Sequence, residues 1–274
     1  MKNGFSRAAA TYDDAAVLAR ETGRRLGERL GYTKIQPTRV ADIGCATGDG
    51  VRDLQQRFPK AQPLAIDFAR PMLHAVRQRV PLLSRLKRSA PQLIQADVRQ
   101  LPLAANSLGL VWSNLMLHWL DVPFPAIQDM YRVLEVGGLI TFAVLGPDTV
   151  KEWHAAAAKV GADSTARRFL DMHDWGDMLV KAGFGDPVMD RDDIVLTYQQ
   201  PPQLLADQRH LGVRDAMFGN PGWRSARALL RAWERDNDGL LPLSFEIVYG
   251  QAWKPAPRPA RQTAEGHTVI AFHR

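Results

Sequence analysis

Cysteine is almost absent from this chain. Only Cys45 occurs among 274 residues, which excludes a disulfide framework and favours a reducing compartment, here the cytoplasm. No apolar run approaches the roughly 18 residues that cross a bilayer, so we expect no membrane span. The first residues lack an apolar signal core, so we expect no signal peptide. The seven histidines do not combine with cysteine at zinc-ligand spacing, and we expect no metal site.

The length and charge of the chain limit its class without choosing a function. A chain of 274 residues suits one α/β domain with insertions and a substantial core. The net charge is +6 and the pI is near 9.7, which fits nucleic acid, an anionic membrane or an acidic protein partner. Because basic residues alternate with acids between Arg224 and Asp238, without a stacking-aromatic motif, we expect no nucleic-acid partner.

Residues 39–50, with the sequence RVADIGCATGDG, organise the rest of the chain. They predict a short buried strand at 40–43, a turn of small residues at 44–48 and a helix at 51–58. This arrangement is typical of the nucleotide-binding corner of an open α/β sheet, where small residues let the backbone approach a ligand. The spacing matches neither the dinucleotide fingerprint nor a P-loop.

A second strand at 63–67 ends in Asp67, about twenty residues after the glycines, where a carboxylate can accept both hydroxyls of a ribose. Alternating apolar segments predict a doubly wound α/β sheet. Its further strands are expected at 91–98, 108–114 and 139–145, with helices at 69–79 and 126–134, the second ended by glycines at 136–138. Beyond it we expect helices at 149–160, 173–182, 201–211 and 223–234, and strands at 192–198, 243–253 and 267–273.

The pattern Asp42-x-Gly44-x-Ala46-x-Gly48 resembles motif I of the class I S-adenosyl-L-methionine (SAM) methyltransferases. The resemblance implies a Rossmann-like, mostly parallel sheet of seven strands, whose last strand is antiparallel beside the fifth. It implies SAM as cofactor and S-adenosyl-L-homocysteine as product. The family has glycine where Ala46 stands, and we expect tolerance provided φ is negative there. The cofactor-binding residues that it implies are Tyr12, Asp42, Gly44, Ala46, Gly48, Asp67, Phe68, Met72, Asp97, Val98 and Ser113.

A narrower resemblance rests on Phe5-x-x-x-Ala-x-x-Tyr12, on residues 112–119 and 131–138, and on Leu211-Gly212. These segments look like the malonyl-[acyl-carrier protein] O-methyltransferases of biotin synthesis, over residues 4 to 254. Such an enzyme methylates the free carboxyl of a malonyl thioester. The resemblance implies one methyltransferase domain over 1–274, with a helical lid at 1–35, a helical cap at 199–240 and a basic, proline-rich tail at 254–274.

The expected acceptor needs positioning rather than a general base. A malonyl carboxyl with a pKa near 4 is already ionised at pH 7, so the site needs a cation or hydrogen-bond donor to fix it. The candidates are Tyr12, His118 and Arg209.

The expected partner is an acyl carrier protein, which is acidic. Its docking surface is predicted on a basic helical stripe opposite Trp223, Ala226, Leu230 and Trp233, supplemented by Lys254, Arg258 and Arg261. The stripe comprises Arg224, Arg227, Arg231 and Arg235.

Two other reactions fit the same motifs. The segment Gly146-Pro-Asp148-Thr149 and residues 245–254 also look like the mitochondrial complex I assembly factor that hydroxylates an arginine. A methyltransferase of quinone precursors shares the core motifs, and we expect it to show an apolar pocket without a bound cation.

Overall fold

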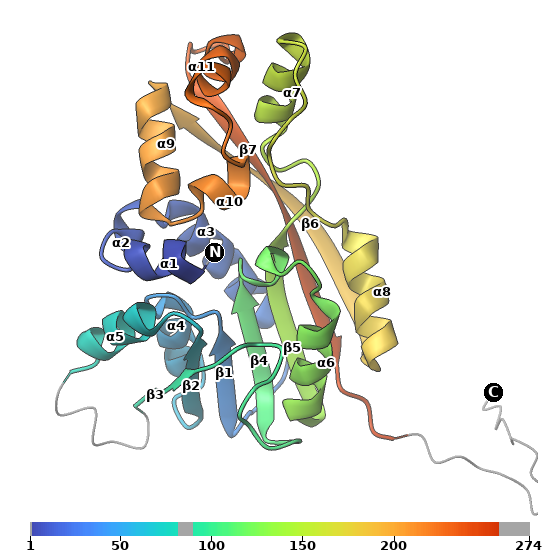
Figure 1. Cartoon of the computed structure of the whole chain (residues 1–274). Helices are drawn as coiled ribbons and strands as arrows, with labels where there is room; N and C mark the ends of the chain where they lie inside the picture. The colour runs from blue at the N-terminus through green and yellow to red at the C-terminus, as the bar shows by residue number, and fades with distance from the viewer. Residues whose placement is uncertain (1, 82–89, 258–274) are drawn as a thin grey trace, which may run out of the picture.

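The computed structural model describes residues 2–81 and 90–257, and these build one seven-stranded sheet in the order β3-β2-β1-β4-β5-β7-β6 (Figure 1). The first five strands are parallel, whereas β7 runs antiparallel to both β5 and β6. The predicted antiparallel last strand beside the fifth is confirmed. The strands are β1 (Arg39–Ile43), β2 (Gln62–Asp67), β3 (Gln92–Gln95), β4 (Leu108–Asn114), β5 (Leu134–Leu145), β6 (Gly185–Tyr198) and β7 (Leu241–Trp253).

Helices cover both faces of this sheet because neighbouring residues of the central strands point to opposite sides. On one face, a row of strand residues packs in the same hydrophobic cluster as residues of α3. This row is Val40, Leu110 and Leu139. On the other face the adjacent row packs with residues of α6: Ala41, Val111 and Ile140. The helices of the doubly wound part are α3 (Val17–Leu30), α4 (Asp49–Arg57), α5 (Arg70–Arg79), α6 (Phe124–Val133), α7 (Lys151–Lys159) and α8 (Met172–Ala182).

The start of β5 differs from the prediction. Residues 134–138 open the strand instead of ending a helix, and the pairing with β4 shifts there, from Leu108 opposite Leu134 to Leu110 opposite Leu139. Gly137 has a φ of 80°, which suits the irregular backbone of this bulge. The prediction that the glycines at 136–138 end a helix is therefore wrong, since they lie within β5. The predicted strand at 267–273 lies outside the described residues.

Two groups of helices stand over the carboxyl edge of the sheet (Figure 1). One is N-terminal, α1 (Lys2–Ala8) and α2 (Tyr12–Ala15). The other lies between β6 and β7 and comprises α9 (Pro201–His210), α10 (Arg214–Phe218) and α11 (Trp223–Ala232). The two groups meet where Gly4 approaches Gly212: a Cβ on Gly4 would lie 2.5 Å from the Gly212 carbonyl oxygen. Thr11 also donates its hydroxyl to the His210 carbonyl at 3.2 Å.

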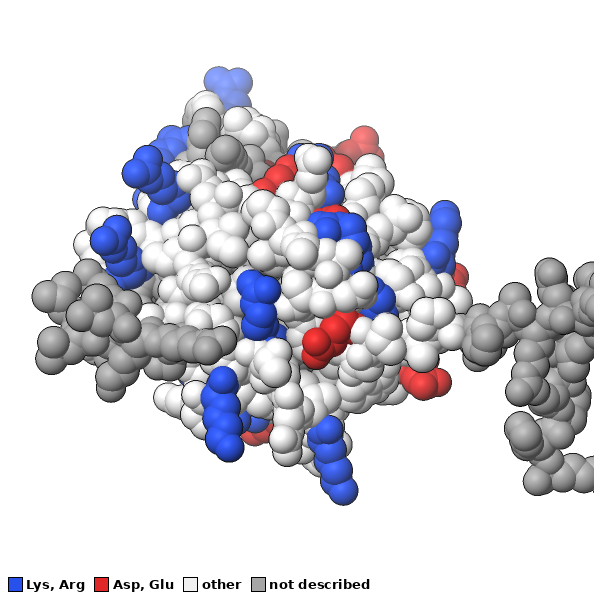
Figure 2. Space-filling view, turned by 90° about the horizontal axis from the view of Figure 1, so that it is seen from below, with Lys and Arg blue, Asp and Glu red and all other residues white. Residues whose placement is uncertain are grey.

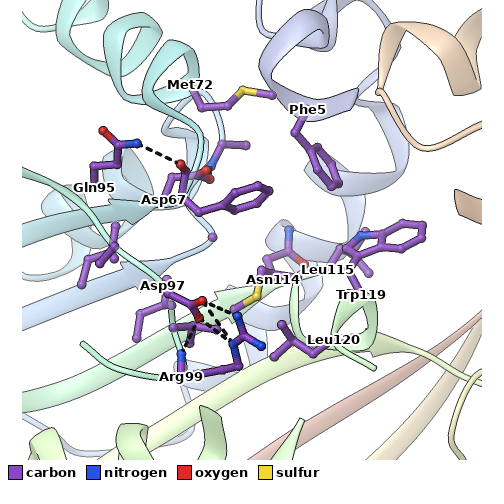
Figure 3. A pocket seen from close by; sticks show the side chains of 18 of the residues that line it. Phe5, Asp67, Met72, Gln95, Asp97, Arg99, Asn114, Leu115, Trp119 and Leu120 are labelled. Atoms are coloured by element: carbon purple, nitrogen blue, oxygen red, sulfur yellow. Dashed lines mark hydrogen bonds and ion pairs between the residues drawn. The ribbon is translucent and has the colours of Figure 1, made fainter. Parts of the chain in front are cut away.

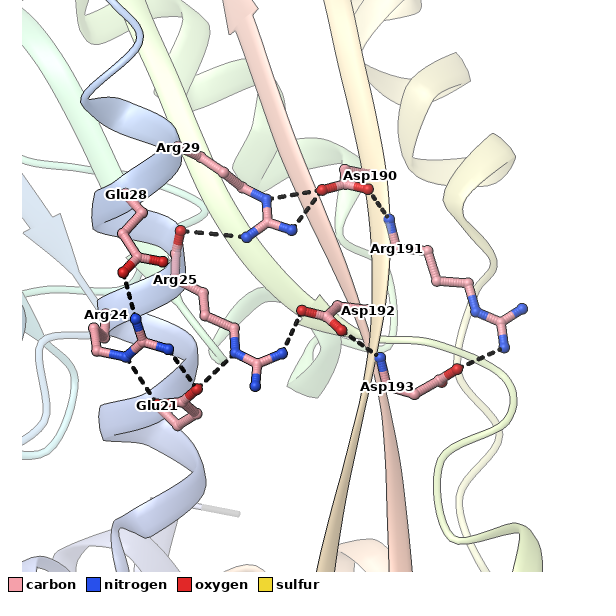
Figure 4. Close-up of polar contacts among 9 residues, drawn as sticks. All are labelled: Glu21, Arg24, Arg25, Glu28, Arg29, Asp190, Arg191, Asp192 and Asp193. Carbon is pink, nitrogen blue, oxygen red and sulfur yellow. Dashed lines mark hydrogen bonds and ion pairs between the residues drawn. The ribbon is translucent and has the colours of Figure 1, made fainter.

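An ion-pair network ties α3 to the edge strand β6 (Figure 4). Arg25 pairs with Asp192 and Arg29 with Asp190, and the Arg29 guanidinium also lies 3.8 Å from the centre of the Tyr249 ring. Several charges share these contacts, so the network contributes more than isolated surface pairs do. It fixes the helix that follows α2 against the sheet.

Candidate active site

The turn after β1 is built to hold the Asp67 carboxylate. One oxygen of Asp67 accepts the Ala46 N–H at 3.1 Å, and the other accepts the Ala69 N–H at 2.7 Å. Each oxygen keeps a further lone pair, so the oriented carboxylate can accept two neighbouring hydroxyls. Burial raises the pKa of Asp67 to about 6, against the lowering effect of the Ala69, Ala46 and Phe68 N–H groups.

Ala46 lies in the left-handed region with a φ of 44°. The condition set for tolerance of alanine at this position, a negative φ, is not met, and the Ala46 N–H points toward Asp67. An alanine in this conformation costs about 1 kcal/mol relative to the ordinary helical region. Gly44, with a φ of 79°, cannot be replaced by alanine without a clash, because an added Cβ would lie 2.4 Å from the Met116 Cγ.

A cavity of about 500 Å³, here the cofactor cavity, opens at the carboxyl ends of β1, β2 and β4 (Figure 3). Phe5 and Trp119 bound it on one side, with their ring centres 6.2 Å apart, and Phe5 makes an edge contact with Phe68 at 6.1 Å. The predicted cofactor residues that line this cavity are Tyr12, Gly44, Ala46, Asp67, Phe68, Met72, Asp97 and Val98.

Asp97 lies at the opposite wall of the cofactor cavity, where it could meet an adenine amino group. Its carboxylate accepts hydrogen bonds from the Arg99 guanidinium at 2.6 Å and from the Arg99 backbone N–H at 2.9 Å. Nearby, the Gln95 amide donates to the Phe68 carbonyl at 3.2 Å and so fixes the loop that presents the Phe68 ring. The local turn explains part of the Asp97 geometry, and its adenine contact stays a prediction.

Ser113 is not among the residues that line the cofactor cavity. Its buried hydroxyl donates to the Ile43 carbonyl at 2.9 Å and joins β4 to β1. The next residue, Asn114, lines the cavity instead, and its Nδ2 donates to the Ala19 carbonyl at 2.8 Å. The Asn114 Oδ1 is buried with no partner among the described residues. Successive strand residues point to opposite faces, which is why the two adjacent residues differ in their surroundings.

Asp42 lies on the far side of the glycine turn, in a cavity of about 290 Å³, here the turn cavity. Its carboxylate accepts the Val51 N–H at the start of α4, and burial, followed by the charge of Asp67, raises its pKa to about 8. Gly48 lines neither cavity; it precedes α4 with a φ of 94° and borders a hollow beside Arg79. The turn and cofactor cavities share Tyr12, Gly44, Ala46 and Asn114.

These groups fit a cationic nucleoside such as SAM. Asp67 offers two oriented oxygens for a ribose, while Asp42 and the unpartnered Asn114 oxygen offer acceptors for an ammonium group next to the turn. Among residues 2–81 and 90–257 no group of three His, Cys, Asp or Glu side chains could hold a metal ion. No helix of that part is long and apolar enough to cross a membrane.

Tyr12 lies where the cofactor cavity, the turn cavity and a smaller third cavity meet. Burial and the charge of Asp67 raise the pKa of Tyr12, so its hydroxyl keeps its proton. The following residue, Asp13, accepts the Thr47 hydroxyl at 2.7 Å and pairs with Arg79, and Arg79 also donates to the Thr47 carbonyl at 2.9 Å. We call Asp13, Thr47 and Arg79 the α2 latch.

We expect Asp13→Ala to raise the Kd for SAM about fivefold to tenfold, which corresponds to roughly 1 kcal/mol for a part-exposed ion pair with a hydrogen bond. The loss follows because the latch holds Tyr12 over both cavities. Calorimetric titration measures the Kd. Asp14→Ala is the matched control, since Asp14 is exposed and adjacent. Equal affinities of the two variants would contradict a role for the latch.

The affinity for SAM is also expected to depend on pH through Asp67. The ionised carboxylate is the form that accepts ribose hydroxyls, and its pKa is about 6 before binding. The Kd should therefore rise as pH falls below 6, by up to about tenfold per unit. The stability of the ligand-free protein should change in the opposite direction: a pKa raised by folding gives a contribution that is present at low pH and lost as pH rises through 6. Calorimetric titrations and unfolding measurements between pH 5 and 8 test the two signs, and Asp67→Asn should remove the rise of the Kd below pH 6.

The residues predicted to bind the methyl acceptor lie in different parts of the structure. His118 lies in the short helix η2 (Leu117–Trp119) and lines the third cavity, here the acceptor cavity, together with Tyr12. Arg209 lies on the outer face of α9, where its Nε donates to the Leu205 carbonyl at 3.3 Å, and it lines none of these cavities. Helix phase explains the difference, because the buried positions of α9 are Leu204 and Gln208.

Comparison with known proteins now defines the class. A family model described as a methyltransferase domain matches residues 41–142, from β1 to β5. In fold, the chain is similar to a Haemonchus contortus phosphoethanolamine N-methyltransferase 2 in complex with SAM, with a TM-score of 0.57, 16% identity, and coverage of 92% of this chain and 57% of that one. The fold of this chain is that of the class I methyltransferases.

Curated relatives match almost the whole chain. A malonyl-[acyl-carrier protein] O-methyltransferase of Laribacter hongkongensis is 44% identical over 100% of this chain and 95% of its own. One from Gallionella capsiferriformans is 44% identical over 96% of this chain and 93% of its own. The chain belongs to the malonyl-[acyl-carrier protein] O-methyltransferase family.

Proposed function

We propose that this protein methylates the free carboxylate of a malonyl thioester carried by acyl carrier protein, at the start of the pimeloyl branch of biotin synthesis, in the cytoplasm. SAM supplies an activated methyl group on a sulfonium. The full-length similarity to relatives of that name carries the proposal. A malonyl carboxylate is ionised at neutral pH, so the chain has to orient and desolvate it rather than remove a proton.

Within this reaction we assign the helices over the sheet edge to access. We assign the lid, expected at 1–35, to α1 and α2, and the cap, expected at 199–240, to α9, α10 and α11, since α1 and α2 meet α9 and the following turn above the cofactor and acceptor cavities. Both groups have to separate for a carrier-linked substrate to enter. The rest of 1–274 belongs to the same methyltransferase domain. Of the expected tail at 254–274, only 254–257 lies within the described residues.

The deciding assay supplies labelled SAM with malonyl-carrier protein, malonyl-CoA or a quinone precursor. We expect a base-labile methyl ester on the malonyl thioester. The quinone alternative keeps one supporting observation, because the acceptor cavity is mainly apolar and no charged side chain lines it within the described residues. Methylation of the quinone alone would overturn the proposal. Rescue of a biotin auxotroph provides a cellular test.

We further propose that the carrier protein docks on α11. Arg224, Arg227 and Arg231 are exposed there, and Trp223 is 70% exposed with the Arg224 guanidinium 5.6 Å from its ring. On the face seen from below in Figure 1, by contrast, basic side chains stand singly (Figure 2). An acidic partner with an apolar contact residue suits the α11 surface.

Parts of the predicted docking surface need correction. Trp223 is exposed rather than buried, and Leu229 is the buried residue of α11. Arg235 lies beyond the helix end and donates to the carbonyls of Gln199 and Gly239, so it stabilises a loop. Lys254 is 9% exposed and bonded within the protein. Arg258 and Arg261 lie outside the described residues.

Reversing the charge of Arg227 and Arg231 to Glu should raise the KM for malonyl-carrier protein about tenfold, because two attractions become repulsions. The Kd for SAM and the KM for malonyl-pantetheine should not change. Lys34→Glu with Lys60→Glu is the matched control, since it makes the same charge change at exposed positions before β1 and β2. A docking site elsewhere is indicated if the two double variants give the same KM.

A further inference from the structure

The acceptor cavity adjoins the cofactor cavity, with which it shares Phe5, Tyr12, Leu115 and Trp119. Its volume is about 60 Å³. At about 10–15 Å³ for each water-sized group, it has room for about four to six such groups, enough for the four heavy atoms of a carboxymethyl group. It is closed by residues from η2, β6, β7, α9 and α10, so the cap completes it. The chemistry of its few polar atoms therefore decides what it can hold.

His118 presents one of these polar atoms. Its Nδ1 accepts the Leu145 N–H at 3.2 Å, so the proton of the neutral ring is on Nε2. Burial, followed by the charge of Arg167, holds the pKa of His118 well below its ordinary value. Trp119 and Phe169 fix the ring, at centre distances of 4.7 and 5.4 Å. The buried Nε2 has no partner among the described residues, which leaves an N–H donor without an acceptor.

Gln208 presents a second donor from α9. It is 2% exposed, lines the acceptor cavity, and makes a side-chain hydrogen bond with Tyr198. Tyr198 also bonds to Asp207, whose carboxylate only accepts, so the Tyr198 hydroxyl donates to Asp207. The Gln208 amide then donates to the Tyr198 oxygen. These bonds hold the Gln208 side chain beside Tyr198 at the cavity wall, and an amide carries a second N–H donor.

The polar lining of the acceptor cavity is thus neutral. Apart from apolar side chains, only Tyr12, His118, Tyr198 and Gln208 line it within the described residues. We propose that the malonyl carboxylate is bound by neutral donors, the His118 Nε2–H and the Gln208 amide, with Tyr198 positioning Gln208. This inference rests on the proposed function and replaces the cation expected at Arg209.

Neutral donors suit the charge change of the reaction. A carboxylate oxygen forms a bond to the methyl carbon while the carbon–sulfur bond breaks, and sulfur keeps the electron pair. A negative and a positive charge disappear and no proton moves. An arginine beside the carboxylate would stabilise the anion more than the transition state and slow the transfer. Neutral donors in an apolar cavity orient the oxygen without that loss.

Binding of malonyl-pantetheine to the protein saturated with S-adenosyl-L-homocysteine tests the inference without turnover. His118→Asn keeps an acceptor for the Leu145 N–H but has no donor at the position of the His118 Nε2, and Gln208→Leu removes the amide. Each variant should raise the Kd for malonyl-pantetheine about tenfold to hundredfold, the range for a hydrogen bond to a charged group. The Kd for S-adenosyl-L-homocysteine should stay within about twofold. Gln203→Leu, on the exposed side of α9, is the matched control.

The outcomes separate the inference from the proposed function. If the unmodified protein binds and methylates malonyl thioesters, and both variants keep its Kd for malonyl-pantetheine, neutral binding by His118 and Gln208 is overturned while the function stands. If the unmodified protein neither binds nor methylates any malonyl thioester, the proposed function itself fails. Tyr198→Phe adds a distinguishing readout. It should raise the Kd for malonyl-pantetheine when Gln208 is present. In the double variant with Gln208→Leu, it should cause no further rise in that Kd.

Discussion

Asp67→Ala should raise the Kd for SAM at least about a hundredfold. The substitution removes two charge-assisted hydrogen bonds to the ribose, each worth roughly 1.5–3 kcal/mol, and every 1.4 kcal/mol is tenfold in Kd. It also leaves the Ala46 and Ala69 N–H groups without their acceptor, so the turn itself loosens. Isothermal titration with SAM and with S-adenosyl-L-homocysteine measures both effects together.

Asp97→Asn is the comparator for Asp67→Ala. Asp97 lines the same cavity, but its side chain is 50% exposed and already paired with Arg99, so we expect a loss of less than about tenfold. Circular dichroism establishes that both variants fold. A Kd for Asp67→Ala within tenfold of the unmodified protein would remove the ribose assignment and, with it, the placement of SAM in the cofactor cavity.

Lys254→Met should lower the free energy of unfolding by about 3–5 kcal/mol, because it deletes buried hydrogen bonds of a charged donor. The Lys254 ammonium donates to the Asn106 Oδ1 at 2.8 Å and to the carbonyls of Tyr131 and Leu134 at 2.8 and 2.7 Å. These bonds hold the bulged start of β5 and the end of α6 against β7. The Leu134 carbonyl would be left buried without this donor.

Thermal and urea unfolding measure the loss, which corresponds to a fall in Tm of roughly 10 °C for a protein of this size. Lys60→Met is the control, because Lys60 is exposed. At a temperature where Lys254→Met is folded, its KM for malonyl-carrier protein should equal that of the unmodified protein. A raised KM with unchanged stability would return Lys254 to the docking surface.

The cofactor half of the site follows from local sequence. Gly44 and the short residues after it dictate a turn that few other sequences form, and Asp67 ends the strand that pairs with the preceding one in parallel register. Carboxyl ends of neighbouring parallel strands meet at one edge, so residues far apart in the chain are placed together by topology alone. This is why Gly44 and Ala46 of the predicted turn line one cavity together with Asp67, Phe68 and Met72.

The residues of the acceptor cavity could not be predicted in the same way, because the sequence pattern does not show which face of a helix or strand points into the cavity. Arg209 and Gln208 are neighbours on α9, yet a rotation of one residue puts Gln208 in the acceptor cavity and Arg209 in solvent. The same holds for Ser113 and Asn114 on β4. The family resemblance favoured Arg209 and Ser113, whereas packing placed their neighbours at the cavities.

The sequence by itself determined the doubly wound sheet and the acid at the end of β2, because these depend on short-range patterns and on strand order, whereas the antiparallel last strand was implied by the family resemblance. Only the tertiary structure decided which side chains close the acceptor cavity. It also decided that Lys254 is buried and hydrogen-bonded within the protein and that Trp223 is exposed. Those outcomes depend on how the lid, the cap and β7 pack against segments more than a hundred residues away, as the bond from Lys254 to the Leu134 carbonyl illustrates. Such contacts are set by the fit of whole surfaces and are not encoded in any local pattern.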